Sequence, residues 1–263
     1  MSKNLSFYTT VLSVVIAVFL VHTPISLAYG YNQPLESTAM NTALENARNN
    51  TVKVKVQGDM DSLGTGWVVK PGYVLTNAHV VENKYTGTGN VSIRFYTDSD
   101  KSTNYVKATL LAVDALHDIA LLEYRHKPSN PKGIELADKV YVGAQMISVG
   151  NPVVEQDDSG ADTIYTNPTI LDFAYTTGAF VGEQLRLWEV PQVSNVPTMV
   201  IDMFSSQGNS GGPIVNESGQ VTGMVRGYLD TKHRMSLGVP LNDIKTFLDT
   251  NLPRIATVVN TSF

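Results

Sequence analysis

The chain has 263 residues, of which 43% are hydrophobic and 16% charged, and this is enough for one or two compact domains with a hydrophobic core. The lack of cysteine excludes a disulfide-stapled miniprotein, a thiolate nucleophile and a cysteine-based zinc site, and the lack of an HExxH motif leads us to expect no metal and no cofactor. The net charge of −5, without a basic stripe, leads us to expect no nucleic-acid partner.

The first 28 residues have the order of a secretory signal peptide. Lys3 precedes an apolar run over residues 11–21, which is followed by Pro24 and by small residues at positions 26 and 28. Because the run is shorter than the roughly 20 apolar residues that span a bilayer, we expect cleavage after Ala28 rather than a permanent anchor. The sequence therefore predicts a secreted or periplasmic chain without stable membrane insertion after signal removal.

An N-terminal segment, residues 29–50, precedes the first expected strand. Loose helical spacing over residues 35–50 predicts one short helix, with Ser37 or Thr38 as its N-cap. From residue 51 the hydrophobic period changes to two, which is typical of strands. The strands expected in this part are 52–56, 66–69, 73–76, 91–96, 105–113 and 119–124.

Between two of these strands, Pro71 and Gly72 fit the central positions of a type II turn. Two prolines and a glycine at 127–133 indicate the linker to a second set of strands. The strands expected there are 141–150, 176–182, 198–203, 212–216, 219–228 and 235–240.

Helical spacing returns only at the end of the chain, over residues 241–252. We expect Asn242 or Asp243 near the N-cap of this helix and Pro253 at its end. Two sets of about six short strands predict an all-β fold with two six-stranded antiparallel barrels. We place the first barrel at 51–133, the second at 134–240, and a C-terminal helix and tail at 241–263.

Three phrases carry residues suited to nucleophilic catalysis: TNAHVV around His79, HDIALL around Asp118 and GNSGGP around Ser210. A serine hydroxyl needs an imidazole as general base, and the imidazole needs a carboxylate on its other nitrogen. The glycines beside Ser210 allow a tight loop that would direct the N–H groups of Gly208 and Ser210 into one oxyanion hole. Each phrase is weak alone, but together they predict a catalytic site.

The segments GTGWVV, GYVLTNAHVV, DALHDIALL, SVGNP, GNSGGPIVN and LGVP resemble trypsin-like serine proteases of the HtrA/Deg type. The resemblance covers roughly residues 50–250 and implies a two-barrel serine endopeptidase that acts through an acyl-enzyme. It assigns His79 as general base, Asp118 as orienting carboxylate, Ser210 as nucleophile, and Gly208 with Ser210 as oxyanion donors. Only 23 residues follow Pro240, so we expect no PDZ domain.

The same resemblance implies polypeptide substrates, and unfolded proteins in particular. It also implies a homo-trimer formed through N-terminal aromatic residues, for which Tyr29 and Tyr31 are the candidates. Pancreatic-type relatives have an aspartate where this chain has Asn209, and that aspartate pairs with a newly cut N-terminus. Asparagine cannot form this ion pair, so we expect no activating cut beyond signal removal. Residues 153–175 form a longer connection than the family suggests, and we assign it no role.

The resemblance also places the pocket for the side chain before the scissile bond. Phe204 lies six residues before the nucleophile, at the floor, and Val225, Arg226 and Gly227 lie along one wall. Without an aspartate at the floor, we expect small or medium aliphatic residues rather than lysine or arginine. This expectation takes the Arg226 side chain to face solvent; if it turned into the pocket it would favour acidic residues.

Two alternatives compete with this interpretation. Residues 208–212 also satisfy the G-x-S-x-G pattern of α/β-hydrolases, but in those enzymes the acid and the histidine follow the serine, and strands alternate with long helices. Neither condition holds here. The other alternative is a protease-like fold kept as a catalytically silent binding protein, although this chain retains every member of the triad.

Overall fold

The structure, a computed structural model, describes most of the chain after the N-terminal segment. The described residues are 31–32, 34–35, 37–57, 62–83, 87–88, 90–98, 104–125, 131–154, 169–186, 196–230 and 235–259. The expected signal peptide and Tyr29 lie outside the described residues, as do the middle of the 153–175 connection and part of the 127–133 linker.

Six strands close the first barrel in the order β1-β2-β3-β8-β7-β6, with antiparallel pairing throughout. Their bounds are β1 (Thr51–Gln57), β2 (Ser62–Lys70), β3 (Tyr73–Thr76), β6 (Asn90–Phe95), β7 (Val106–Asp114) and β8 (Ile119–Tyr124). The helix α3 (Ala78–Val81), the small sheet of β4 (Glu82–Asn83) and β5 (Gly87–Thr88), and the 3₁₀ turn η2 (Tyr96–Asp98) lie between these strands in sequence.

The second barrel has the order β12-β13-β16-β15-β14-β9, again with antiparallel pairing. Its strands are β9 (Gln145–Gly150), β12 (Ala174–Arg186), β13 (Val196–Asp202), β14 (Pro213–Asn216), β15 (Val221–Asp230) and β16 (Met235–Pro240). A short hairpin of β10 (Val153–Val154) and β11 (Thr169–Ile170) precedes β12. Because both sheets close on themselves, neither barrel leaves an unpaired edge. The prediction of two six-stranded antiparallel barrels is confirmed.

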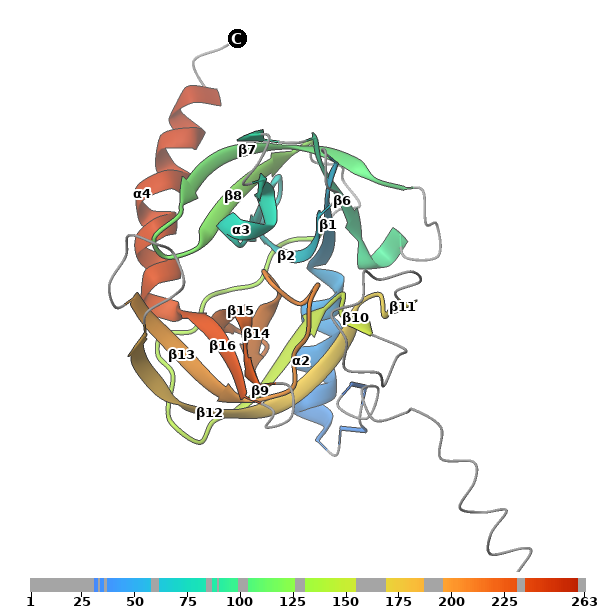
Figure 1. Ribbon diagram of the computed structural model, residues 1–263, viewed down its shortest axis with the longest axis vertical. Helices are drawn as coiled ribbons and strands as arrows, with labels where there is room; N and C mark the ends of the chain where they lie inside the picture. The colour runs from blue at the N-terminus through green and yellow to red at the C-terminus, as the bar shows by residue number, and fades with distance from the viewer. Residues whose placement is uncertain are drawn as a thin grey trace, which may run out of the picture.

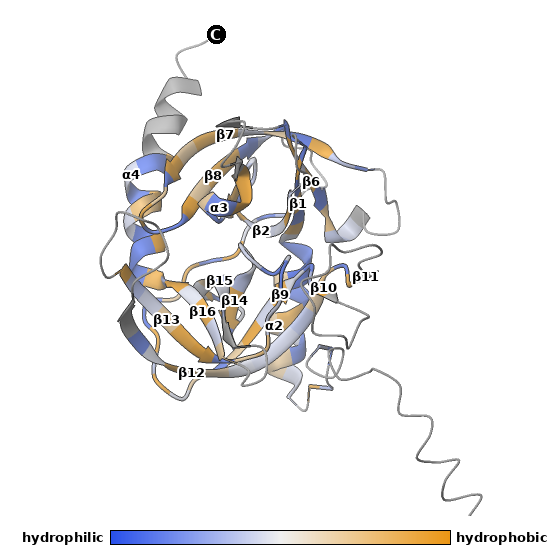
Figure 2. Cartoon of the chain, in the orientation of Figure 1, coloured by the Kyte–Doolittle hydropathy of each residue, from blue (hydrophilic) through white to orange (hydrophobic). Residues whose placement is uncertain are grey.

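The alternating sequence of β1 illustrates how these strands form. Val52, Val54 and Val56 are buried in the core of the first barrel, as a period of two requires. Hydrophobic residues occur along the strands of both barrels (Figure 2). The predicted turn between β2 and β3 is also present, and Gly72 has the positive φ, 92°, that a type II turn requires of its third residue.

A hydrophobic cluster separate from the core of the first barrel joins the two barrels. It contains Trp67 and Leu121 from the first barrel, Val149 and Met224 from the second, and side chains from both long helices. The helix α2 (Thr38–Asn49) packs on β9 and β14, whereas α4 (Leu241–Val259) runs along β15, β16 and β7 and so contacts both barrels (Figure 1). The two barrels therefore share one continuous core at their seam.

The helix ends differ in part from the expectations. Ser37 is the N-cap of α2, as predicted, and its hydroxyl accepts a hydrogen bond from the N–H of Met40 at 3.5 Å. The prediction that Pro253 ends the last helix is wrong, because α4 continues to Val259. Proline removes one helical N–H and crowds the preceding turn, which disfavours a helix without forbidding it.

Two strands of the second barrel also differ from the expected ranges. Strand β9 begins at Gln145, four residues later than predicted, because the chain turns at Gly143, where φ is 84°. Strand β12 is longer than predicted at 13 residues. Among the described residues, no helix is both long and apolar enough to cross a membrane.

Candidate active site

The first barrel supplies His79 and Asp118, which lie side by side. His79 is in α3, directly after β3, and Asp118 lies at the turn that leads into β8. The carboxylate oxygens of Asp118 lie 2.9 and 3.0 Å from His79 Nδ1. Because a carboxylate only accepts hydrogen bonds, this contact places the ring proton on Nδ1 and leaves Nε2 as the basic nitrogen.

Local contacts fix the orientation of this pair. The backbone N–H of His79 donates to Asp118 Oδ1 at 3.0 Å, and the Asn77 side chain donates to the Asp118 carbonyl at 2.9 Å. Asp118 has a φ of 60°, in the left-handed region that aspartate tolerates better than most residues. Its side chain is 4% exposed, whereas that of His79 is 37% exposed. The carboxylate is therefore shielded from water while the imidazole remains accessible.

Ser210 lies in a tight loop that only glycines could build. Gly208 and Gly211 have φ values of 88° and 86°, which side chains rarely adopt. A Cβ at Gly208 would lie 2.2 Å from the Asn151 carbonyl oxygen, and one at Gly211 would lie 2.0 Å from the Thr65 carbonyl oxygen. The GNSGG sequence is thus required by backbone conformation and close packing together.

The first barrel holds this loop through Thr65 on β2. The N–H of Thr65 donates to the Ser210 carbonyl at 2.8 Å, and its hydroxyl donates to the Gly208 carbonyl at 2.7 Å. Asn151 in turn donates to the Thr65 hydroxyl through its backbone N–H and its side-chain amide. These contacts bring the serine of the second barrel to the wall of the first.

Two further features prepare Ser210 for chemistry. The N–H groups of Gly208 and Ser210 have no backbone acceptor among the described residues, so both are available to an incoming oxyanion. The Ser210 hydroxyl donates to the Arg226 carbonyl at 3.2 Å. Within the described chain no hydrogen bond joins it to His79, and such bonds commonly tighten only when substrate is present.

Comparison with known proteins agrees with this arrangement. The family model described as "Trypsin-like peptidase domain" matches residues 64–224, which include His79, Asp118 and Ser210. The chain belongs to the trypsin-like peptidase domain family.

Proteins named as serine proteases are among those similar to this chain. A "Probable periplasmic serine endoprotease DegP-like" of Pseudomonas savastanoi pv. phaseolicola is 28% identical over 169 residues, which are 64% of this chain and 29% of that protein. The "Serine protease Rv3671c" of Mycobacterium tuberculosis is 32% identical over 164 residues, 62% of this chain and 36% of that protein. The chain thus spans about a third of the length of these relatives.

A solved structure shares the fold. The crystal structure titled "Rv3671c protease from M. tuberculosis, active form" superposes with a TM-score of 0.63 at 22% identity, covering 84% of this chain and 88% of that one. At 22% identity the match supports the two-barrel fold alone. The chemistry has to be argued from the residues of the site.

Three of the expected pocket residues lie behind the Ser210 loop. Phe204 is 7% exposed and Val225 is 1% exposed. The Gly227 carbonyl accepts a hydrogen bond from the Ser205 hydroxyl at 3.4 Å. The structure therefore places Val225 and Gly227 on β15 beside the loop, while the Phe204 ring packs among Tyr31, Ala174 and Leu171.

The expectation that Arg226 faces solvent is wrong. Its side chain is buried, with Nε 3.6 Å from Asp118 Oδ2, and it donates to the Thr198 hydroxyl at 3.2 Å and to the His117 carbonyl. Burial lowers the pKa of Arg226, while Asp118, Asp243 and Asp114 oppose that shift. The guanidinium lies inside because the Asp118 carboxylate and two neutral acceptors replace the water that it loses.

Sequence reasoning missed three residues that organise the site. Thr65 lies between two glycines of the GTGWVV segment, and Asn151 lies in SVGNP, so both are in motifs that carried the resemblance. Tyr31 precedes the first helix in a stretch without any motif, and its hydroxyl accepts a hydrogen bond from the Asn209 side chain. Only Thr65 and Asn151 had a signal in the sequence that could have identified them.

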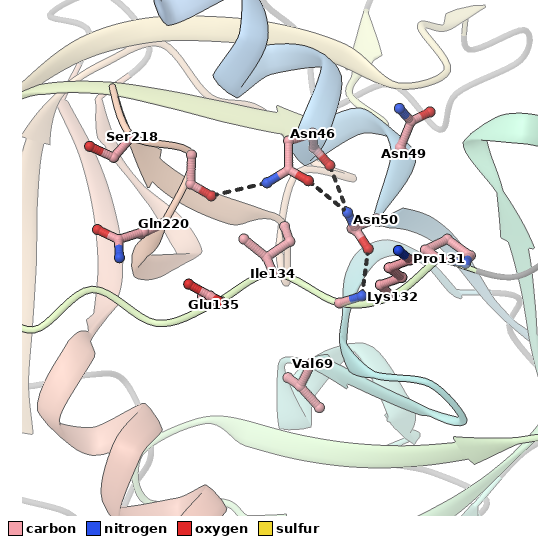
Figure 3. Close-up of a pocket in the computed structure, with 12 residues that line it drawn as sticks. Asn46, Asn49, Asn50, Val69, Pro131, Lys132, Ile134, Glu135, Ser218 and Gln220 are labelled. Carbon is pink, nitrogen blue, oxygen red and sulfur yellow. Dashed lines mark hydrogen bonds between the residues drawn. The ribbon is translucent and has the colours of Figure 1, made fainter.

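A separate cavity of about 580 Å³ lies away from these residues, between α2, the 131–135 segment and the 218–220 turn (Figure 3). The amides around it bond within the protein: Asn50 donates to the Asn46 carbonyl and accepts from the Gly133 N–H, and Asn46 donates to the Gly219 carbonyl. These bonds tie the helix to both barrels. In the described residues no three His, Cys, Asp or Glu side chains are grouped as metal ligands would be.

Proposed function

We propose that the chain is a serine endopeptidase that hydrolyses polypeptides at the seam between the two barrels. Ser210 is the nucleophile, His79 the general base, Asp118 the orienting carboxylate, and the N–H groups of Gly208 and Ser210 form the oxyanion hole. The observation that carries this proposal is the contact of His79 Nδ1 with the shielded Asp118 carboxylate, beside a loop whose glycines present Ser210. Membership of the trypsin-like peptidase family supports it.

The reaction follows from these positions. The Ser210 hydroxyl rotates from the Arg226 carbonyl towards His79, loses its proton to Nε2 and attacks the substrate carbonyl carbon. The carbonyl oxygen becomes negative and is stabilised by the two free N–H groups. His79 then protonates the leaving amine as the C–N bond breaks, and an acyl-enzyme remains. Water, deprotonated by His79, hydrolyses that ester and restores Ser210.

We infer further that the substrates are unfolded proteins in an extracytoplasmic compartment. The signal-peptide pattern of residues 1–28 supports the location, as does the word "periplasmic" in the name of the Pseudomonas relative. A homo-trimer stays a prediction, but Tyr31 is buried in its own chain and so offers no aromatic surface to another copy.

The proposal extends to the residue before the scissile bond. With Arg226 engaged by Asp118, its guanidinium is not available to an acidic substrate side chain. An aromatic floor at Phe204 with Val225 and Gly227 on the wall favours valine, alanine or leucine, with loose selectivity because one methylene changes binding by only about 1–3 kcal/mol. Mass spectrometry of a digested, denatured protein reads this preference. A profile dominated by Glu, or by Lys and Arg, would contradict it, whereas Phe204→Ala is expected to admit Phe and Tyr.

The mechanism is tested by Ser210→Ala in the mature chain. Loss of the nucleophilic oxygen is expected to lower kcat by about 10⁶-fold, as in other serine triads, and to abolish labelling by a fluorophosphonate probe. Ser218→Ala, at an exposed turn remote from the site, is the matched control and should label like the wild type. Cleavage that persists in Ser210→Ala would overturn the assignment. A wild-type chain that neither labels nor cleaves would favour the silent binding protein.

A further inference from the structure

Tyr31 connects the segment before the first helix to the Ser210 loop. Its side chain is 4% exposed, and its ring meets the Phe204 ring edge-on with centroids 5.1 Å apart. The next residue, Asn32, donates its N–H to the Tyr175 carbonyl at 2.9 Å and accepts from the Tyr175 N–H at 3.1 Å. The segment is thus anchored on β12, and Tyr31 points from it into the second barrel.

The Tyr31 hydroxyl lies in a chain of hydrogen bonds. The Asn209 side-chain amide donates to it at 2.8 Å, and the hydroxyl lies 3.1 Å from Ser206 Oγ. Ser206 Oγ also lies 3.2 Å from the Val153 carbonyl, and when it donates there Tyr31 can donate to Ser206 Oγ. Burial raises the pKa of Tyr31 to about 12, against smaller opposing effects of Ser206 and Asn209, so the phenol keeps its proton at neutral pH.

These contacts enclose the oxyanion-hole residue Gly208. Ser206 and Asn209 flank the turn that contains it, and the Asn209 N–H donates to the Ser206 carbonyl at 3.2 Å. Asn209 is buried, and its oxygen approaches Gly150 so closely that a Cβ there would lie 2.4 Å away. In the described part of the chain, the polar partner of the Asn209 amide group is the Tyr31 hydroxyl. The Asn209 side chain is therefore held by packing on one side and by Tyr31 on the other.

We infer that Tyr31 is a positioning residue for the oxyanion hole, acting through Asn209 and Ser206 to hold the Gly208 N–H in place. The inference rests on the proposed function. In the pancreatic-type relatives, an aspartate at the Asn209 position forms an ion pair with a newly cut N-terminus. Here the uncharged Tyr31 side chain holds the residue at that position instead. With the Tyr31 side chain in this place, no α-amino group has to pair with the residue at position 209.

The direct test is Tyr31→Phe in the mature chain, which keeps the ring on Phe204 and removes only the hydroxyl. The buried Asn209 amide then lacks its acceptor and the loop loosens. Loss of a whole oxyanion donor lowers kcat by about 10²–10³-fold, so we expect displacement of one donor to lower kcat by about 10- to 100-fold. KM should stay within about threefold, and affinity for a peptide aldehyde, which forms an oxyanion on binding, should fall in parallel with kcat.

Tyr124→Phe is the matched control. Tyr124 is also buried and also meets a phenylalanine edge-on, with its ring centroid 5.2 Å from that of Phe95, but its hydroxyl has no hydrogen-bond partner among the described residues. We expect it to leave kcat and aldehyde affinity unchanged. If Tyr31 acts through Asn209, Asn209→Ala and the double variant should have the same kcat. Equal kcat in Tyr31→Phe and wild type, or losses that multiply in the double variant, would overturn the inference.

A readout without catalysis separates this inference from the proposed function. Amide hydrogen exchange of residues 206–210 is expected to speed up by at least tenfold in Tyr31→Phe and to stay unchanged in Tyr124→Phe. The measurement can be made in the Ser210→Ala background. Unchanged exchange in Tyr31→Phe would overturn the role of Tyr31 even in an active protease. Faster exchange in a chain that never cleaves would uphold the loop contact and reject the protease.

Discussion

The two halves of the candidate site are held in different ways. His79 and Asp118 are fixed by short-range contacts within the first barrel, from Asn77 and from the His79 backbone itself. The Ser210 loop instead depends on groups from elsewhere, namely Thr65 of the other barrel and Tyr31 of the N-terminal segment. The His79–Asp118 pair is therefore held as one unit within its own barrel, whereas the Ser210 loop is positioned by groups from the other barrel and from the N-terminal segment.

Arg226 links these halves. Its backbone carbonyl accepts the Ser210 hydroxyl, and its buried guanidinium lies beside Asp118. A residue of strand β15 in the second barrel thus contacts Asp118 of the first. This difference predicts three sizes of effect. A change in the His79–Asp118 pair should lower the catalytic rate most, and a change in a residue that links the two barrels should lower the stability of the fold. An extension of the chain before Tyr31 should change activity little.

The largest effect is expected from Asp118→Asn. The substitution turns one acceptor oxygen into an NH₂ donor, and where this donor faces Nδ1, which lies 2.9 Å from Asp118 Oδ2, the tautomer with the proton on Nε2 becomes favoured. By analogy with other trypsin-like triads, kcat should fall by about 10⁴-fold. Steady-state kinetics with an aliphatic peptide ester measures this, and circular dichroism verifies the fold. A loss below tenfold would show that the His79–Asp118 unit does not drive catalysis.

Next in size is the link made by Arg226. Arg226→Leu leaves the buried Asp118 carboxylate without its cation and Thr198 without a donor, so the free energy of unfolding should fall by about 3–5 kcal/mol. Urea denaturation measures the change. Lys245→Leu is the control, because among the described residues Lys245 makes a single exposed hydrogen bond, to the Asp138 carbonyl. It should change that free energy by about 0.5 kcal/mol or less. Equal effects of the two variants would mean that Arg226 does not connect the halves.

A smaller, pH-dependent effect is expected at another contact between the barrel regions. Asp172, just before β12, pairs with Lys53 on β1 at 2.5 Å and with Arg94 on β6. Burial alone would raise the pKa of Asp172, but the hydrogen bonds and charges of Lys53 and Arg94 outweigh it and hold the pKa below its ordinary value.

Because the folded-state pKa is the lower one, the stabilisation is present above the ordinary pKa of about 3.9 and is lost as the pH falls through the folded value. Asp172→Asn should therefore lower Tm at pH 7, and the difference from wild type should shrink as the pH approaches about 3. Thermal unfolding at a series of pH values measures this. A Tm difference that does not vary with pH would show that the Asp172 charge contributes nothing.

The smallest effect is expected from extending the N-terminus of the mature chain with a peptide tag. Tyr31 reaches the Ser210 loop through its side chain, and Asn209 has no charge to pair with an α-amino group. Activity should therefore stay within a few fold of the untagged chain, as measured by the same ester assay. A tagged form that is silent until a processing protease removes the tag would contradict both this prediction and the asymmetry between the two halves.

Local sequence was sufficient to predict much of this molecule. The period-two pattern of hydrophobic residues predicted the two sets of strands. Such a prediction is possible because the alternation of side chains between the two faces of a strand is a local property. His79, Asp118 and Ser210 could be proposed from sequence because nucleophilic catalysis restricts residue type, and the glycines because positive φ and close packing restrict it further. The sequence did not predict α3, and it misplaced the end of α4 at Pro253, since packing along both barrels decides how far that helix continues.

The contacts that hold the site were decided only by the tertiary structure. Tyr31 and Asn209 are 178 residues apart, and no pattern near either one encodes their hydrogen bond. The Arg226 side chain lies inside rather than in solvent because the Asp118 carboxylate of the other barrel is there to receive it. Periodicity and residue type determine which groups are present and which local conformations they adopt. Which of these groups meet depends on how the two barrels and the N-terminal segment pack together.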